Sequence, residues 1–248
     1  MVEERDLEFW HAFRTRPVVV TYGFFALNIL IFLLMSLAGG TENEATLLAF
    51  GVKANAQIDQ GEIWRFVTPV FIHIGILHIL FNSYAIWIIG PTVEKLYGGA
   101  RFTLIYLVTG IAGVYGSYWY HPRDISAGAS GAIFGLFGAL LVFGLKYRSS
   151  IPPMFQKAVG KGVLQVVVIN LVIGFLPGID NSAHVSGLIM GAIVAAVIPY
   201  QRPGSSTSSA FKIIQAALAI VVLLSFYEVV VHYNGPAISF RNLSRIVE

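Results

Sequence analysis

Residues 18–38 read VVVTYGFFALNILIFLLMSLA, an apolar run of 21 residues without a charged side chain. A helix needs about 20 predominantly apolar residues to cross the hydrocarbon core of a bilayer. The run therefore predicts a membrane-spanning helix. It is also longer than the roughly 7–15 apolar residues of a cleaved signal peptide, so we expect this helix to remain in the mature protein.

Further along the chain, the same criterion predicts six more spanning helices. The fifth span is the least regular, because Lys161 lies inside it and can only extend its amine toward a lipid headgroup. Short loops join the spans, so no room is left for a separate soluble domain. The predicted spans after the first are Val70–Gly90, Phe102–Tyr120, Gly128–Leu145, Ala158–Leu176, Ala183–Tyr200 and Phe211–Val231.

The predicted fold is therefore an all-α polytopic membrane helix bundle, with a six-helix core and one additional helix at its C-terminal side. A stretch rich in Ser and Gly separates the additional helix from the core and reads as a linker. The predicted divisions are an N-terminal segment at 1–17, the core at 18–200, the linker at 201–210, the seventh helix at 211–231 and a tail at 232–248.

Composition excludes several classes of protein. Charged residues make up 12% of the chain and apolar residues 56%, whereas soluble domains carry about 25% charged residues. A soluble cytosolic enzyme is therefore excluded. The chain has no cysteine, which rules out disulfides, thiolate catalysis and Cys-ligated metals. We expect the lipid bilayer as a partner, and no cofactor, bound metal or nucleic acid.

The distribution of basic residues predicts the orientation, because cytoplasmic loops carry an excess of Lys and Arg. Eleven basic residues lie inside and five outside if the N-terminus is cytoplasmic. We therefore expect the N-terminus inside, the starts of the fourth and sixth spans at the outer face, and the cell (plasma or inner) membrane as the location. The inner group is Arg5, Arg14, Arg16, Lys95, Arg101, Lys146, Arg148, Lys157, Lys161, Arg202 and Lys212; the outer group is Lys53, Arg65, Arg123, Arg241 and Arg245.

Four polar residues stand out within the predicted spans, where such groups are costly and therefore candidates for function. His78 and Asn82 are four residues apart and share a face of the second span. Ser130 lies near the start of the fourth span, and His184 lies near the start of the sixth. Each also has a plain structural reading: a membrane serine commonly bonds its own i−4 carbonyl, and a lone His or Asn commonly links helices.

Two pairs of glycines, Gly131/Gly135 and Gly187/Gly191, predict that the fourth and sixth helices approach closely. That approach would bring Ser130 and His184 to similar depth. A hydroxyl needs a base to become a good nucleophile, and an imidazole is the usual base. The N–H groups at a helix N-terminus favour an anion, and further side-chain donors can stabilise the same oxyanion.

These residues fall into motifs that resemble the rhomboid family of intramembrane serine proteases. Over roughly residues 64–191, the Trp64-Arg65 pair is similar to a pair in the family's first loop. His73, His78 and Asn82 are similar to its His-rich second-helix motif. The nucleophile and base motifs are matched by Gly128-Ala129-Ser130-Gly131 and by Ala183-His184-x-x-Gly187-x-x-x-Gly191.

The resemblance implies a Ser–His dyad without a third carboxylate, acting as an endopeptidase on single-span or multi-span membrane proteins. By position, Ser130 would be the nucleophile and His184 the general base. His78, Asn82 and the Ser130 backbone N–H would form the oxyanion hole. Phe134 departs from the pattern, since several relatives carry Tyr there; its ring can still pack on His184, but the hydroxyl is lost.

Other functions are less consistent with the sequence. An inactive rhomboid-like protein that binds membrane clients is the main alternative, although such relatives typically lack the Ser or the His. A retinal receptor would need a Lys within the last helix, and an ion-coupled carrier several carboxylates in the membrane. A metal site at His73 and His78 is disfavoured by their spacing of five, which separates them on a helix.

Overall fold

The computed structural model describes residues 2–202 and 204–239. Within these ranges the chain is helical apart from its loops, and its extended pairing is one antiparallel bridge between Lys53 and Ser126. The predicted all-α class is confirmed. Arg241 and Arg245, counted in the charge distribution, and the predicted tail after Ser239 lie outside the described residues.

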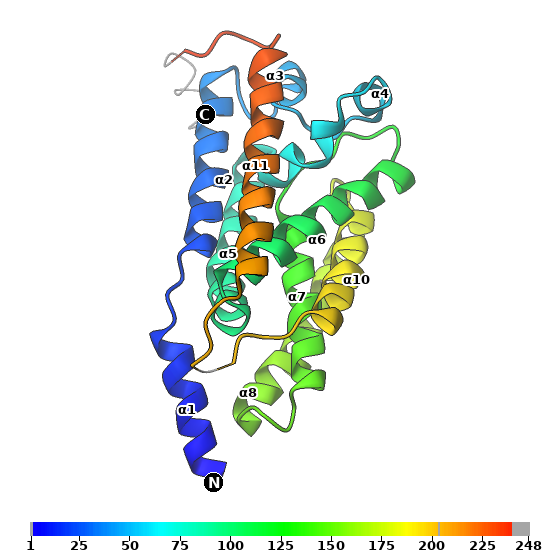
Figure 1. Ribbon diagram of the computed structural model, residues 1–248. Coiled ribbons are helices and arrows are strands. Elements are labelled where there is room, and N and C mark those ends of the chain that lie inside the picture. The colour runs from blue at the N-terminus through cyan, green and yellow to red at the C-terminus, as the bar shows by residue number, and fades with distance from the viewer. Residues whose placement is uncertain (1, 203, 240–248) are drawn as a thin grey trace.

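Short helices precede and separate the long ones (Figure 1). Their order along the described chain is α1 Val2–Thr15, α2 Val20–Leu37, α3 Glu44–Ala49, α4 Asn55–Asp59, the 3-10 turns η1 Ile63–Phe66 and η2 Thr68–Phe71, α5 Gly75–Tyr97, α6 Gly99–Tyr120, α7 Ser130–Lys146, α8 Pro153–Lys157, the π-helical turn η3 Ala158–Gly162, α9 Val163–Ile173, α10 Asn181–Val197 and α11 Ser209–Val231.

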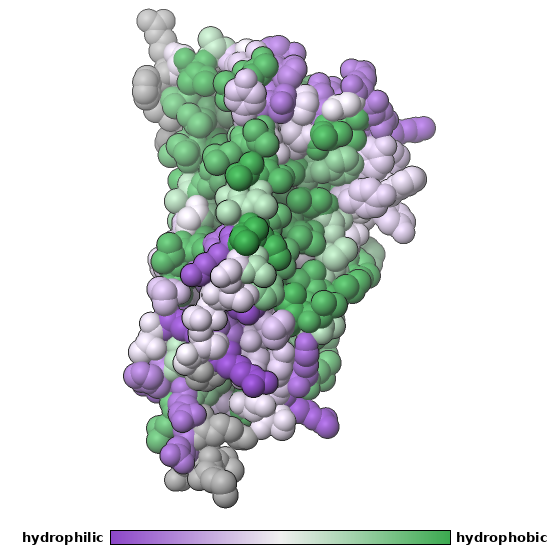
Figure 2. Space-filling model, viewed as in Figure 1, coloured by the Kyte–Doolittle hydropathy of each residue, from purple (hydrophilic) through white to green (hydrophobic). Residues whose placement is uncertain are grey.

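Helix α7 forms the centre of the bundle, with α6 and α10 packed against it and against each other. Every residue from Gly131 to Leu140 is buried. Helix α11 runs beside α6, on the side that carries α2 in Figure 1. On the face shown in Figure 2, hydrophobic residues cover most of the middle, and hydrophilic residues gather toward the two ends.

By length and composition, four helical stretches of the described chain can cross a bilayer: Asp6–Leu37, Gly75–Tyr97, Pro153–Ile173 and Ser209–Val231. The other three predicted spans correspond to α6, α7 and α10. Helices α7 and α10 have 17 residues each, fewer than a lipid-exposed span usually needs. Because these three helices pack on one another, protein replaces lipid around much of their surface.

The second span begins later and ends later than the apolar pattern predicts. Thr68–Phe71 forms a 3-10 turn, and α5 begins at Gly75, whose positive φ of +76° suits glycine. The helix then continues through Pro91 to Tyr97. Burial of Val93 and Leu96 holds its last turns in place. The apolar pattern did not predict these turns, because the hydropathy of the sequence drops after Gly90.

The buried carboxylate of Glu94 joins α5 to the start of α2. Its two oxygens accept hydrogen bonds from the backbone N–H groups of Val19, Val20 and Thr21 at 3.0, 2.9 and 2.7 Å. These groups have no partner within their own helix, so Glu94 caps α2 from a distant segment. Arg16 adds a second link by donating to the carbonyl of Lys95 at 2.6 Å.

The fifth span begins and ends earlier than predicted. One helical stretch runs from Pro153 to Ile173 through α8, the π-helical turn Ala158–Gly162 that contains Lys161, and α9, which ends at Ile173 rather than Leu176. The N-terminal segment was not predicted to be helical, yet α1 forms there and packs Phe9 and Phe13 on Phe155 of α8, with ring centroids 5.1 and 5.2 Å apart.

Candidate active site

Ser130 is the first residue of α7, as its motif predicted. Two backbone N–H groups fix the segment before it. The Gly128 N–H donates to the Pro69 carbonyl at 2.9 Å, and the Ala129 N–H donates to the side-chain Nε2 of His73 at 3.4 Å. The Ser130 N–H is among those without a partner inside the helix. Ser130 itself is half-buried.

The two glycine faces meet as predicted. A Cβ added at Gly187 would overlap the carbonyl oxygen of Gly131, and one added at Gly191 would overlap that of Gly135. Only glycine permits such an approach between two helix backbones. The contact brings the start of α10 against the start of α7, so the backbones next to Ser130 and His184 are in direct contact.

His184 is 8% exposed and stacks on Phe134, with ring centroids 4.2 Å apart and an interplanar angle of 9°. The predicted packing of Phe134 on this histidine is therefore confirmed. His184 Nδ1 is buried without a hydrogen-bond partner, and Ser130 and His184 are not hydrogen-bonded to each other. Catalytic hydrogen bonds of this kind often tighten only when substrate binds.

His78 lies against the segment that carries Ser130. Its Nδ1 accepts from the Ile74 N–H at 3.2 Å, so a neutral ring carries its proton on Nε2. A Cβ at Gly128, whose φ is +124°, would lie 2.5 Å from that Nε2. Glycine is thus required at this position for two reasons: its backbone conformation and the close approach of the imidazole. The Nε2 atom of His78 therefore faces the loop at Gly128, two residues before Ser130.

Asn82 follows His78 by one turn of α5. Its Nδ2 donates to the His78 carbonyl at 2.9 Å, while its buried Oδ1 has no partner. The amide nitrogen therefore retains one further N–H for another acceptor. Both side chains predicted to supply oxyanion donors therefore lie one turn apart on α5, a helix that also contacts α7.

The interpretation that His73 and His78 are separated on one helix is wrong. His73 precedes α5, and the chain turns at Gly75, so the two rings lie with centroids 5.2 Å apart. His73 is fully buried, with its Nδ1 unpartnered.

Trp64 and Arg65 lie elsewhere and are not brought together with Ser130 and His184 by any described contact. Arg65 is buried, donates to the Val52 carbonyl at 2.9 Å and pairs with Glu62 at 2.6 Å. Trp64 stacks on His232 after α11, with centroids 5.0 Å apart. In this structure the pair therefore joins the loop after α4 to neighbouring segments.

Sequence reasoning missed two charged residues near the site, Lys53 and Asp180. Burial lowers the pKa of Lys53. Burial by itself would raise the pKa of Asp180, but hydrogen-bond donors around the carboxylate outweigh it and hold the pKa below its usual value. The one available signal was the Asp-x-x-x-His spacing before His184, which places a carboxylate at the N-cap of α10.

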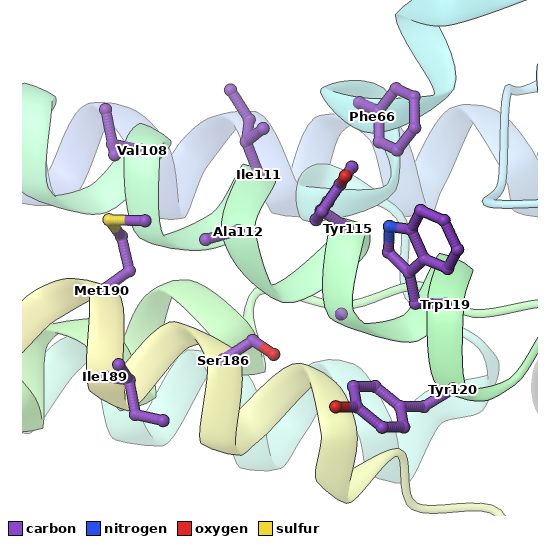
Figure 3. A pocket seen from close by; sticks show the side chains of 11 residues that line it. Phe66, Val108, Ile111, Ala112, Tyr115, Trp119, Tyr120, Ser186, Ile189 and Met190 are labelled. Atoms are coloured by element: carbon purple, nitrogen blue, oxygen red, sulfur yellow. The ribbon is translucent and has the colours of Figure 1, made fainter.

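A groove of about 1050 Å³ lies between α6 and α10, away from His184 (Figure 3). Ser186 projects into it from α10, opposite Gly116, whereas His184 points toward Phe134 of α7. Trp119 and Tyr120 lie at one end of this groove and Val108 and Met190 toward the other. The groove and the candidate site therefore occupy different faces of α10.

A family model described as the rhomboid domain matches residues 60–201. This chain belongs to the rhomboid family. It is 43% identical over 215 residues to the rhomboid protease GluP of Bacillus subtilis (strain 168), a match that covers 86% of this chain and 41% of the relative. As a member of this family with long apolar helices, it is an integral membrane protein.

More distant relatives match the same region. RHOMBOID-like protein 6, mitochondrial, of Arabidopsis thaliana is 35% identical over 164 residues, which is 64% of this chain and 52% of the relative. The rhomboid protease AarA of Providencia stuartii is 28% identical over 173 residues, 61% of this chain and 62% of the relative. The chain thus spans about half the length of the curated relatives it matches.

Proposed function

We propose that this protein is an intramembrane serine endopeptidase that hydrolyses transmembrane segments of other membrane proteins. The observation that carries the proposal is the contact between α7 and α10, which joins the helix that begins with Ser130 to the helix that holds His184. The proteases among its relatives support the same class of reaction.

In the proposed mechanism, Ser130 Oγ attacks the scissile carbonyl carbon while the His184 imidazole takes the hydroxyl proton. Collapse of the tetrahedral intermediate breaks the peptide C–N bond, and His184 returns the proton to the leaving amine. Water then attacks the acyl–Ser130 ester with His184 again as base, which releases the carboxylate product. Phe134 holds the imidazole plane through its stacking contact.

The oxyanion of the intermediate would receive hydrogen bonds from the His78 Nε2–H, the free Asn82 N–H and the Ser130 backbone N–H. Donors fixed before the reaction stabilise developing charge most effectively in a site of low dielectric constant. The Ile74–His78 hydrogen bond supports this role, because it leaves the proton of a neutral ring on the nitrogen that faces the Gly128–Ser130 loop.

The proposal is tested with purified protein in liposomes that contain a single-span reporter substrate. Ser130→Ala and His184→Ala should each abolish cleavage, and the double variant should be no worse than either single one, because the dyad acts as a unit. A fluorophosphonate should label the native protein but not Ser130→Ala. Ser186→Ala is the matched control, since that hydroxyl lies on the opposite face of α10, and it should cleave normally.

Cleavage by Ser130→Ala at the native rate would contradict the proposal. If neither the native protein nor any variant cleaves or is labelled, the alternative of an inactive client-binding protein is favoured.

We also propose that the N-terminus is cytoplasmic and that the site opens to the outer face, from the distribution of basic residues. Since the chain has no cysteine, single cysteines report without background. Arg123→Cys, in the loop before α7, should react with an impermeant maleimide added to intact cells. Ser206→Cys, in the linker before α11, should not. The reverse labelling pattern would require the opposite orientation.

A further inference from the structure

The carboxylate of Asp180 lies between the loop that precedes Ser130 and the helix that carries His184. Its Oδ2 accepts from Ser126 Oγ at 2.9 Å. Its Oδ1 accepts from Ser182 Oγ at 2.5 Å and from the Ala183 N–H at 3.2 Å, which caps α10. One side chain therefore contacts both elements of the proposed dyad, from a position outside the helices themselves.

The loop is held from its other side by Lys53. The fully buried amine donates to the His121 carbonyl at 2.6 Å and to the Asp124 carbonyl at 2.9 Å. The backbone of Lys53 also pairs with Ser126 through two hydrogen bonds, at 3.0 and 3.1 Å. The backbone of Ser126 is thus fixed by Lys53, and its hydroxyl is left to reach Asp180.

We propose that Asp180 is a positioning residue that sets the nucleophile loop against the base helix through its bond to Ser126. This inference rests on the proposed function, since it concerns the geometry of Ser130 and His184. The charged groups around the carboxylate are limited in the described chain to His121, whose Nε2 lies 3.8 Å from Oδ1, and to Lys53 and His184 at longer range.

The two oxygens of Asp180 have separable roles. Ser is about as good an N-cap residue as Asp, so in Asp180→Ser the single hydroxyl oxygen can still accept from the Ala183 N–H. It has no second oxygen at the position of Oδ2, so the bond to Ser126 is lost. The change removes the link between loop and helix and retains the cap of α10. A displacement of about 1 Å between reacting groups can cost a large factor in rate, while substrate binding is left unchanged.

The experiment compares Asp180→Ser, Ser126→Ala and the double variant in the liposome cleavage assay. We expect kcat to fall about tenfold in Asp180→Ser with KM within about twofold of the native value, since positioning acts on the chemical step. The rate of fluorophosphonate labelling should fall in parallel. The double variant should be no slower than Asp180→Ser, because both changes break the same bond.

Asp59→Ser is the matched control. Asp59 also accepts from a hydroxyl, that of Tyr118 at 2.6 Å, but it lies on α4, away from both elements of the dyad. It should leave kcat unchanged. The thermal midpoint of Asp180→Ser should stay close to that of the native protein if the cap persists.

An unchanged kcat in Asp180→Ser would overturn the inference, as would losses that multiply in the double variant or a loss confined to KM. A fall in kcat that only accompanies a large drop in the thermal midpoint would assign Asp180 to helix capping alone and would also overturn it. Because each variant is compared with an active native protein, these outcomes are distinct from failure of the proposed function, in which no protein would cleave.

Discussion

Helices α7 and α9 are both apolar, but their surroundings differ. From Gly131 to Leu140 every residue of α7 is buried, whereas α9 buries Val163 and Val167 and exposes most of its other side chains. The packed helix begins with the proposed nucleophile, and the exposed one leads through a short loop to Asp180 and α10. We therefore expect tight packing to hold the proposed dyad in place, and we expect the loosely packed α9 to be the element that moves when a substrate enters.

The largest expected effect is a fall in kcat at one of two asparagines that make the same kind of local hydrogen bond. Asn82 of α5 donates to the carbonyl of His78, and Asn170 of α9 donates to that of Val166, at 2.9 and 2.8 Å. Asn82→Ala should lower kcat by roughly 10²–10³, about 3–4 kcal/mol, as for loss of one oxyanion donor. Asn170→Ala should cleave normally in the same steady-state assay.

His78→Ala should have a similar or smaller effect than Asn82→Ala, because the imidazole also fills space against Gly128. Fluorophosphonate should still label both variants, more slowly, since nucleophile and base are intact. If Asn82→Ala cleaves at the native rate, its amide serves only to link helices.

A methyl group at Gly187 is expected to disrupt the packed pair. In Gly187→Ala the added carbon would overlap the Gly131 carbonyl, and overpacking of this kind costs roughly 1–3 kcal/mol. The thermal midpoint in detergent should fall, and cleavage should fall with it, because the shift separates the helices of Ser130 and His184. A midpoint equal to that of the native protein would show that α7 and α10 can move apart freely.

Restraining α9 is the next test of the comparison. Phe81 on α5 and Val172 on α9 are exposed, at 70% and 63%, so both positions should tolerate cysteine. Cross-linking the two cysteines with a bismaleimide should slow cleavage of an embedded substrate by about tenfold or more while leaving fluorophosphonate labelling intact, because a small reagent needs no displacement of a helix.

The control for this cross-link is the same double-cysteine protein before the reagent is added. Unchanged turnover after complete cross-linking would mean that α9 need not move relative to α5 for the substrate to enter.

The smallest expected effect is at Gly160, in the π-helical turn before α9. A Cβ added there meets nothing within 4 Å, and its φ is not in the left-handed region. Gly160→Ala should therefore stabilise the protein slightly, by up to about 1 kcal/mol, through reduced backbone freedom in the unfolded chain. It is the matched counterpart of Gly187→Ala. A destabilisation of similar size at both positions would mean that the stretch leading into α9 is packed as tightly as the contact between α7 and α10.

Much of the fold follows from patterns local in sequence. Apolar runs locate the long helices, and the glycine pairs predict the contact of α7 with α10. The start of α5 was misplaced because Thr68–Ile74 is as apolar as a helix, and only the turn at Gly75 separates it. Helix α1 was missed because its stability comes from aromatic contacts with Phe155, far along the chain.

The candidate site divides in the same way. Ser130, His184, His78 and Asn82 stand out because polar groups are rare in apolar runs. Lys53 and Asp180 lie in polar loops, where charged residues are common and carry no signal. Their partners are backbone carbonyls and hydroxyls of other segments, which no local pattern reveals.

The cap that Glu94 provides for α2 also has a consequence for biosynthesis. The carboxylate lies 73–75 residues after the N–H groups it binds, and chains leave the ribosome N-terminus first. Until Glu94 is made, the first turn of α2 has three donors without their partner, and such groups are costly near lipid. Helix α2 therefore acquires this cap only after α5 has been synthesised, and until then water or lipid headgroups must satisfy these N–H groups.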